Sequence, residues 1–108
     1  MFVVTADQIG SRRGVDLVPD LLANLAMRTW PDVALPFVRT VGDEVQGVLT
    51  SAETALDVVL HLVRLGEWSV GLGIGPGLLG ATAPESSGEA FILARTAVER
   101  AKGRGLPV

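Results

Sequence analysis

The sequence contains no cysteine, no tyrosine and a single histidine, His61. Without cysteine the chain has no disulfide framework, no thiolate nucleophile and no cysteine-ligated zinc site, so a reducing compartment is permitted and the cytoplasm is the expected location. His61 lies on the polar side of a predicted helix, where a solvated side chain is far commoner than a metal ligand. We assign it no role.

An excess of positive charge is also missing, because the net charge is −3 and the isoelectric point is about 5.0. Such a balance gives no long-range field that would gather nucleic acid or an anionic membrane. No strand carries the aromatic pattern with which RNA-binding sheets stack bases. Nucleic-acid binding by an open sheet face therefore ranks last among the functions considered below.

Neither a secretion signal nor a membrane span is predicted. The N-terminus has no basic stretch and reaches a charge at Asp7, which is too early for a signal peptide. The longest uncharged run, residues 68–84, holds five glycines and Pro76, so its backbone would be left unsatisfied in a membrane helix. We therefore expect no membrane partner.

What the chain does have is hydrophobic residues, which make up 48% of its 108 positions and give a mean hydropathy of +0.43. A chain of this length has room for one core, so residues 1–108 are predicted to form a single domain. The high apolar content favours a sheet covered by helices over a sheet left half exposed.

Hydrophobic periodicity divides the chain into strands and helices. Short β-branched runs and a period of two predict strands over residues 2–6, 36–41, 44–50 and 68–75, and helical spacing predicts helices over residues 17–28, 52–65 and 89–102. The first six elements have the βαββαβ order of a ferredoxin-like antiparallel sheet, with an added C-terminal helix. The expected fold class is α+β.

Polar residues at the predicted helix starts fit this division. Asp16 can cap the first helix. Thr50 with Glu53, and Ser86 with Glu89, form capping-box patterns before the other two helices, since each pair can satisfy free N–H groups reciprocally. We therefore expect Thr50 and Ser86 to be the capping residues.

Glycines mark helix ends and one sheet face. Gly66 is predicted to end the second helix, and Gly103 with Gly105 the third. Residues 68–75 alternate large side chains with serine or glycine, so one face of that strand is nearly bare. A bare face indicates close approach by a helix, with a nucleotide as the less favoured occupant.

Two aspartates lie where strands of this sheet end. Asp7 follows the first strand, and Asp43 lies at the tip of a predicted hairpin, where Gly42 accepts positive φ. In a ferredoxin-like sheet the first strand is central and pairs with a hairpin strand, so these carboxylates can converge. Mg²⁺ prefers a few carboxylates together with phosphate oxygens. We therefore predict a divalent-metal site at Asp7 and Asp43, the alternative being two ordinary turn carboxylates.

Arg12 and Arg13 precede the first predicted helix. Guanidinium groups and the free N–H groups at a helix start both favour anions, so this pair is a candidate phosphate contact. The alternative, two solvated loop arginines, is equally open.

Four segments resemble bacterial SatD-family proteins in order and spacing: residues 7–13, 41–47, 71–75 and 88–95. The resemblance covers nearly the whole chain and implies no characterised activity. SatD-like proteins extend beyond the point where this chain stops, so the resemblance implies a truncated or a minimal form that lacks the C-terminal strand or strands. Residues 106–108 would then begin an edge strand, and the exposed edge would favour a homodimer.

The same order is similar, more distantly, to the palm-type domain of class III nucleotide cyclases and GGDEF diguanylate cyclases. In those enzymes an acid after the first strand and an acid on the hairpin turn bind two metals that hold a nucleoside triphosphate, and Asp7 and Asp43 occupy these positions. The resemblance implies Mg²⁺ or Mn²⁺, a nucleotide ligand, and phosphoryl or nucleotidyl transfer. It also implies a catalytic role for Glu44, which matches the GGDEF acid that follows the metal acid.

Some positions depart from the cyclase pattern. Ile92 and Thr96 stand where class III cyclases carry the Asn and Arg that serve the transition state. Arg95 is one place from the second of these positions and would contact the nucleotide only with a shifted helix register. Val41 replaces the first glycine of the GGDEF turn. These departures support a second function from another class, a catalytically inactive palm that acts as a regulatory or oligomerisation module.

Overall fold

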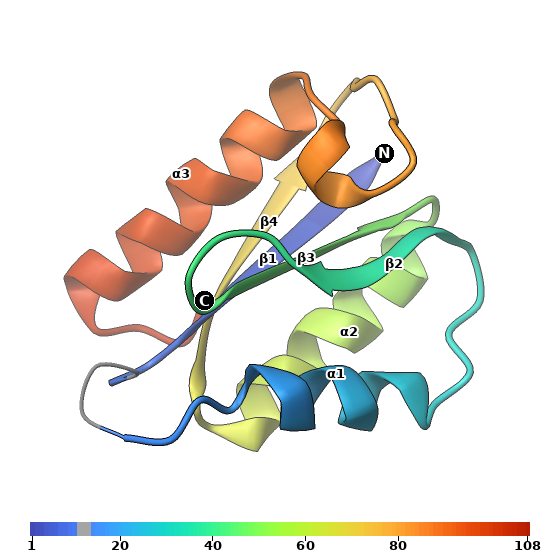
Figure 1. Ribbon diagram of the computed structural model, residues 1–108. Helices are drawn as coiled ribbons and strands as arrows, with labels where there is room; N and C mark the ends of the chain where they lie inside the picture. Colours follow the sequence, from blue (N-terminus) through green and yellow to red (C-terminus); the bar gives the residue numbers. More distant parts are fainter. Residues whose placement is uncertain (11–13) are drawn as a thin grey trace.

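Four strands form one antiparallel sheet in the order β2-β3-β1-β4 in the computed structural model, which describes residues 1–10 and 14–108 (Figure 1). In chain order the elements are β1 (Phe2–Gln8), α1 (Val18–Ala26), β2 (Val33–Arg39), β3 (Glu44–Leu49), α2 (Ala52–Leu65), β4 (Trp68–Ile74), the short 3-10 helix η2 (Ala83–Glu85) and α3 (Glu89–Arg104). The predicted α+β class is confirmed, and the strand order is compatible with a ferredoxin-like sheet.

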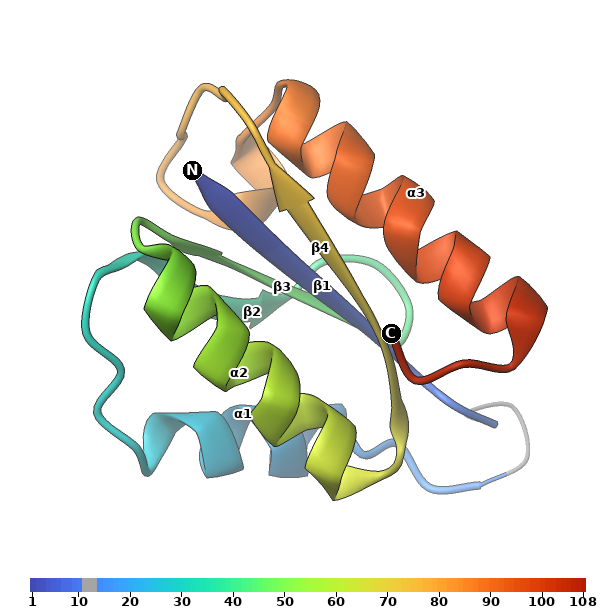
Figure 2. The same cartoon turned by 180° about the vertical axis from the view of Figure 1, so that it is seen from behind.

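The sheet has a helical layer on each face. Figures 1 and 2 show α1 and α2 on one face and α3 on the other. The core under α1 and α2 includes Val4, Ala6, Val45, Leu49, Val58, Leu62, Trp68 and Val70. The smaller core on the α3 side is Val3, Leu35, Val48, Ala83, Ala90, Phe91 and Ala94. No described helix is long and apolar enough to cross a membrane.

Helix α3 packs directly on the bare face of β4. A Cβ added at Gly71 would overlap the backbone of Ala94, and one added at Gly73 would overlap the backbone of Ala90. At Gly75 the nearest atoms would lie 3.8 Å away, which is ordinary contact. The close approach of a helix is thus confirmed at Gly71 and Gly73, and the helix occupies the space that a nucleotide would need there.

The start of α2 differs from the prediction by one residue. Ser51 Oγ accepts a hydrogen bond from Thr54 N at 3.2 Å, so Ser51 is the capping residue. Thr50 Oγ1 instead donates to Asp32 O at 3.2 Å, because Thr50 still lies in the turn that leaves β3. The predicted end of the helix is confirmed by Gly66, which has φ of +80°.

The ends of α3 also correct the predicted boundaries. Gly88, with φ of +116°, precedes the helix, and no side chain caps it. Ser86 Oγ donates to Thr82 O at 2.8 Å, which engages the predicted capping residue within its own loop. At the other end Gly105 terminates the helix with φ of +65°, whereas Gly103 lies inside it.

The last residues of the chain do not form the strand that was predicted over 106–108. They still lie against the edge of the sheet, because Val70 N on β4 donates to Pro107 O at 2.8 Å. The opposite edge, β2, begins earlier than predicted and pairs irregularly with β3 around Pro36. Proline fits there because it has no N–H to offer a neighbouring strand.

Candidate functional site

Two carboxylates face each other across the central strands. Asp7 on β1 pairs in register with Glu44 on β3 and with Ser69 on β4, so the three side chains lie on the same face of the sheet. This is the face that α3 covers. Asp7 and Glu44 are each 7% exposed, so both acids are buried. The sequence-based pairing of Asp7 with the β2–β3 hairpin is correct, but the residue directly opposite is Glu44 rather than Asp43.

Asp7 is only half satisfied. Its Oδ2 accepts a hydrogen bond from Lys102 Nζ at 3.0 Å. Its Oδ1 is buried and has no hydrogen-bond partner in the described part of the chain. Burial raises the pKa of the Asp7 carboxyl, the contact with Lys102 lowers it, and the charges of Glu44 and Asp43 raise it further, with a net rise. An unpartnered buried oxygen of this kind is costly unless a cation or proton reaches it.

Glu44 is held by residues from two other elements. Thr40 Oγ1, in the turn after β2, donates to Glu44 Oε2. The same carboxylate oxygen lies 3.5 Å from Arg95 Nη2 on α3, whose side chain is half exposed. Glu44 and Arg95, predicted as a catalytic residue and a nucleotide contact, therefore lie together as an ion pair.

Asp43 lies beside this pair in the hairpin turn. Glu44 N donates to Val41 O at 2.9 Å, and Gly42 has φ of +55°, so the predicted tight turn is confirmed. Asp43 is half-buried, and its charge contributes to the raised pKa of Asp7. The three carboxylates of Asp7, Asp43 and Glu44 thus share one end of the sheet.

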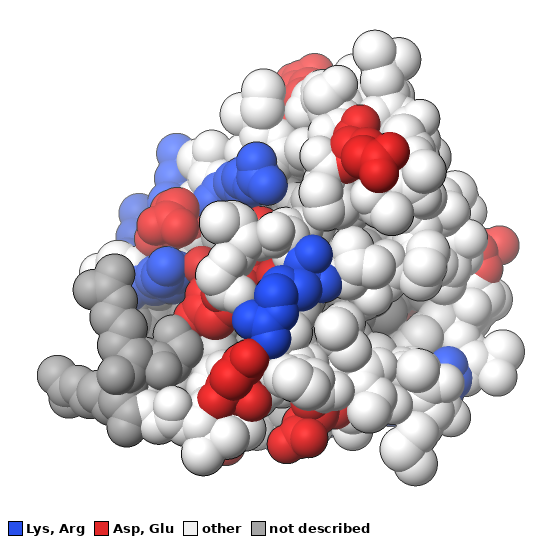
Figure 3. Space-filling model, viewed as in Figure 1, with Lys and Arg blue, Asp and Glu red and all other residues white. Residues whose placement is uncertain are grey.

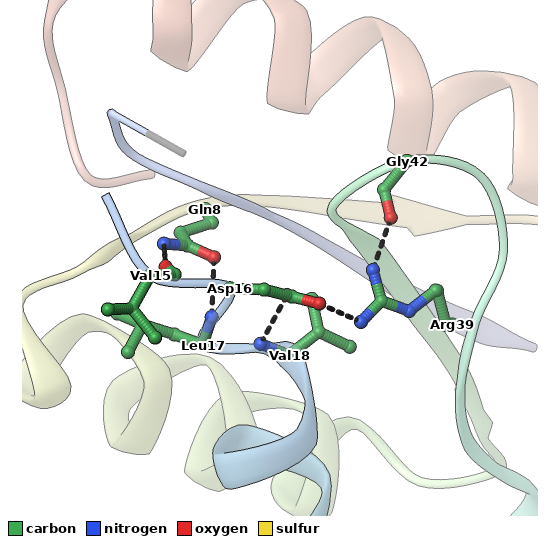
Figure 4. A network of polar contacts seen from close by, with 7 residues as sticks. All are labelled: Gln8, Val15, Asp16, Leu17, Val18, Arg39 and Gly42. Atoms are coloured by element: carbon green, nitrogen blue, oxygen red, sulfur yellow. Dashed lines mark hydrogen bonds and ion pairs between the residues drawn. The ribbon is translucent and has the colours of Figure 1, made fainter. Parts of the chain in front are cut away.

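A polar network fixes the hairpin turn against the loop before α1 (Figure 4). Arg39 on β2 donates to Gly42 O and to Asp16 Oδ2, both at 2.6 Å. Asp16 also accepts from Val18 N at 3.0 Å through its Oδ1, but the N-cap of α1 is Leu17, so Asp16, the predicted capping residue, lies one residue before the capping position. Gln8, at the end of β1, bonds the same loop by accepting from Leu17 N at 2.9 Å. The turn that carries Asp43 is therefore tied to the residues that follow Asp7.

Lys102 is the site residue that was not predicted from the sequence. It lies two helical turns from Arg95 on α3, a spacing that places both cations along one side of the helix. That spacing could have suggested that one side of the helix is basic. Only the packing of α3 on β4 reveals that Lys102 contacts Asp7 and that Arg95 contacts Glu44. Figure 3 shows the result as acidic and basic side chains interleaved over the region where α3 and the hairpin meet.

The predicted phosphate contacts Arg12 and Arg13 lie outside the described residues. Within residues 1–10 and 14–108, no group of three or more histidines, aspartates or glutamates is arranged so that it could hold a metal ion. Mg²⁺ does not require one, because it commonly binds one or two carboxylates and completes its shell with water and phosphate oxygens. The unpartnered Asp7 Oδ1, near two further acids, fits such a cation.

Comparison with known proteins gives no relative for this chain. No family model matches it, and neither a curated protein nor a solved structure shows significant similarity.

Proposed function

We propose that this chain is a SatD-like domain with a cyclase-like palm that binds Mg²⁺ or Mn²⁺ and, through the metal, a nucleotide. The metal ligands are Asp7 and Asp43, and Glu44 is the proposed catalytic residue beside them. The observation that carries the proposal is the buried Oδ1 of Asp7, which has no hydrogen-bond partner among the described residues. A cytoplasmic setting, favoured by the absence of cysteine, is part of the proposal.

The electrostatics of the site support a cation at this oxygen. Burial raises the pKa of the Asp7 carboxyl, and the charges of Glu44 and Asp43 add to that rise, so the local field is unfavourable for a further negative charge. A divalent cation would offset this repulsion more completely than the single charge of Lys102, whose side chain is 44% exposed. Because the lysine is partly exposed, its ammonium group can move away from Asp7 when a metal binds.

A nucleotide is the proposed ligand because of the way such metals bind. Mg²⁺ held by two carboxylates keeps open positions for water or phosphate oxygens. When bound, the metal would supply Lewis-acid polarisation of a phosphoryl group and activation of an attacking oxygen. Arg95 on α3 is half exposed and lies 3.5 Å from Glu44, so its guanidinium can add a phosphate contact. Binding is the core of the proposal, and phosphoryl or nucleotidyl transfer is its catalytic extension.

Isothermal titration calorimetry with ATP and GTP, each with and without Mg²⁺, tests the proposal. We expect a measurable heat only when Mg²⁺ is present, with a dissociation constant below about 1 mM. Asp7→Asn and Asp43→Asn should weaken that binding at least about tenfold. Asp57→Asn, on the exposed side of α2, is the matched control and should bind like the parent. Equal heats with and without Mg²⁺, or none at all, would contradict the proposal.

A second candidate is an inactive palm that serves as a regulatory or oligomerisation module. The ion pairs of Asp7 with Lys102 and of Glu44 with Arg95 favour it, because they neutralise both buried acids without a metal. At the positions of the missing transition-state residues, Ile92 is 66% exposed and the Thr96 hydroxyl bonds the helix backbone at Ile92 O. Light scattering coupled to size-exclusion chromatography tests this candidate, which predicts a homodimer and is contradicted by a strict monomer.

A further inference from the structure

A cavity of about 410 Å³ opens beside the pair formed by Asp7 and Lys102. It lies where the end of β1, the start of β4 and the residues that follow α3 meet. Its lining includes Ile9, Trp68, Ser69, Lys102, Leu106 and Pro107. A volume of this size falls in the range of small-molecule sites, roughly 300–1,000 Å³.

Backbone hydrogen bonds hold the walls of this cavity in place. On one side Ile9 N donates to Glu67 O at 2.9 Å, which joins the end of β1 to the turn before β4. On the other side Pro107 O accepts from Val70 N at 2.8 Å, which joins the last residues of the chain to β4. These two hydrogen bonds fix the backbone on two sides of the cavity, which lowers the ordering cost of binding.

The lining combines apolar side chains with a few polar ones. Ile9 and Leu106 are 56% and 47% exposed, so each leaves apolar surface in water that a ligand could cover. The polar side chains of the lining belong to Gln8, Ser69 and Lys102. Such a lining suits a flat ligand with apolar faces and polar edges, as a nucleobase with its sugar has.

Lys102 connects the cavity to the metal site, because it lines the cavity and also contacts Asp7 Oδ2 at 3.0 Å. We infer that this cavity takes the base and sugar of the nucleotide whose phosphates lie at Asp7. The inference rests on the proposed function and extends it to the part of the ligand that the metal does not contact. It assigns ligand contacts to Ile9 and Leu106, two residues without a structural role in the core.

The test compares a nucleotide with inorganic tripolyphosphate, both titrated in Mg²⁺ by calorimetry. We expect GTP or ATP to bind at least about tenfold more tightly than tripolyphosphate, because only the nucleotide can fill the cavity. Leu106→Ala and, separately, Ile9→Ala should each weaken nucleotide binding by about fivefold to tenfold and leave tripolyphosphate binding unchanged. Leu60→Ala, on the exposed face of α2, is the control and should change neither affinity.

The outcomes separate this inference from the proposed function. If tripolyphosphate binds as tightly as the nucleotide, or if both cavity variants bind the nucleotide like the parent, the cavity assignment is wrong while metal-dependent phosphate binding stands. If neither ligand binds in Mg²⁺, the proposed function and this inference both fail. Both side chains are substantially exposed, so the variants should keep the parent's melting temperature, which is checked first.

Discussion

Lys102 Nζ lies 3.0 Å from Asp7 Oδ2, although the two residues are 95 positions apart in the chain. The contact exists because α3 lies along the glycine face of β4 and carries its basic side over the end of the central strand. The lysine neutralises one carboxylate oxygen and leaves the other without a partner among the described residues. The helix thus supplies a counter-charge at the point where we propose a metal.

Replacing Lys102 tests whether it competes with that metal. In Lys102→Met the side chain keeps similar length but loses its charge, so a cation at Asp7 no longer has to displace it. We expect Mn²⁺ affinity, measured without nucleotide by electron paramagnetic resonance, to rise by about tenfold. Arg104→Met removes one positive charge from the same helix without touching Asp7 and should leave the affinity close to that of the parent. Unchanged or weaker binding in Lys102→Met would show that the two cations do not compete.

The packing of α3 on β4 predicts a sharp difference between two glycines. Gly73→Ala should lower the free energy of unfolding by about 3 kcal/mol, because its Cβ would overlap the backbone of Ala90. Gly75→Ala should change it by less than about 1 kcal/mol, because the nearest atoms lie 3.8 Å from the added Cβ. Urea denaturation followed by circular dichroism measures both values. Equal stability of the two variants would mean that α3 does not lie as described.

The network around Arg39 should matter more for the site than for stability. Arg39→Ala removes an exposed ion pair with Asp16 and the hydrogen bond to Gly42 O, so the cost in unfolding free energy should be small. Because the turn that carries Asp43 is then no longer tied to the loop before α1, we expect Mn²⁺ affinity to fall severalfold. Arg64→Ala, on the exposed side of α2, should leave that affinity unaltered. A parent-like affinity in Arg39→Ala would show that the network does not position the metal ligands.

His61 predicts a pH dependence of stability. Its Nε2 lies 2.7 Å from Asn24 Oδ1, and its Nδ1 lies 2.8 Å from Arg28 Nη1, so it bridges α1 and α2 rather than standing solvated as predicted. Burial lowers the pKa of His61, and the charges of Arg28 and Arg64 lower it further. The ring at Nδ1 can accept from the arginine only while it is neutral.

The sign of the effect follows from proton binding. The ordinary pKa of histidine is about 6.5. Just below that pH the unfolded chain binds a proton at His61, whereas the folded chain, with its lowered pKa, does not yet bind one. The free energy of unfolding should therefore fall as the pH drops below about 6.5, until the folded-state pKa is passed. Comparing His61→Gln with the parent by urea denaturation between pH 7.5 and pH 5 isolates this contribution, since glutamine does not titrate. The same pH dependence of the free energy of unfolding in both proteins would exclude a contribution from His61.

The order of elements was predictable because local patterns determine it. Period two in residues 68–75 and helical spacing in residues 52–65 each match the burial that the tertiary structure imposes. Helix caps were less predictable, since Thr50 and Ser51 are chemically similar and the choice depends on where β3 ends. Ser86 does not cap α3 because the helix begins after Gly88, and the Ser86 hydroxyl is held in its own loop, where it accepts from Gly80 N and donates to Thr82 O.

The residues of the candidate site were likewise predictable only in part. Asp7 and the hairpin acids could be brought together from strand order alone, because pairing in a sheet follows from topology. Lys102 could not, since its contact with Asp7 depends on which face of the sheet α3 covers and how closely it approaches. That approach is decided by packing between residues far apart in sequence, which no local pattern encodes.

The proposed metal site at Asp7 is tested most directly by titrating the ¹⁵N-labelled protein with Mn²⁺ and recording two-dimensional NMR spectra. The paramagnetic ion broadens the amide signals nearest to it. We expect the signals of Asp7, Asp43 and Glu44 to be lost first, at substoichiometric Mn²⁺, while those of α2 stay sharp. In Asp7→Asn this selectivity should disappear. Broadening that begins elsewhere, or that is uniform across the protein, would contradict a metal site at Asp7.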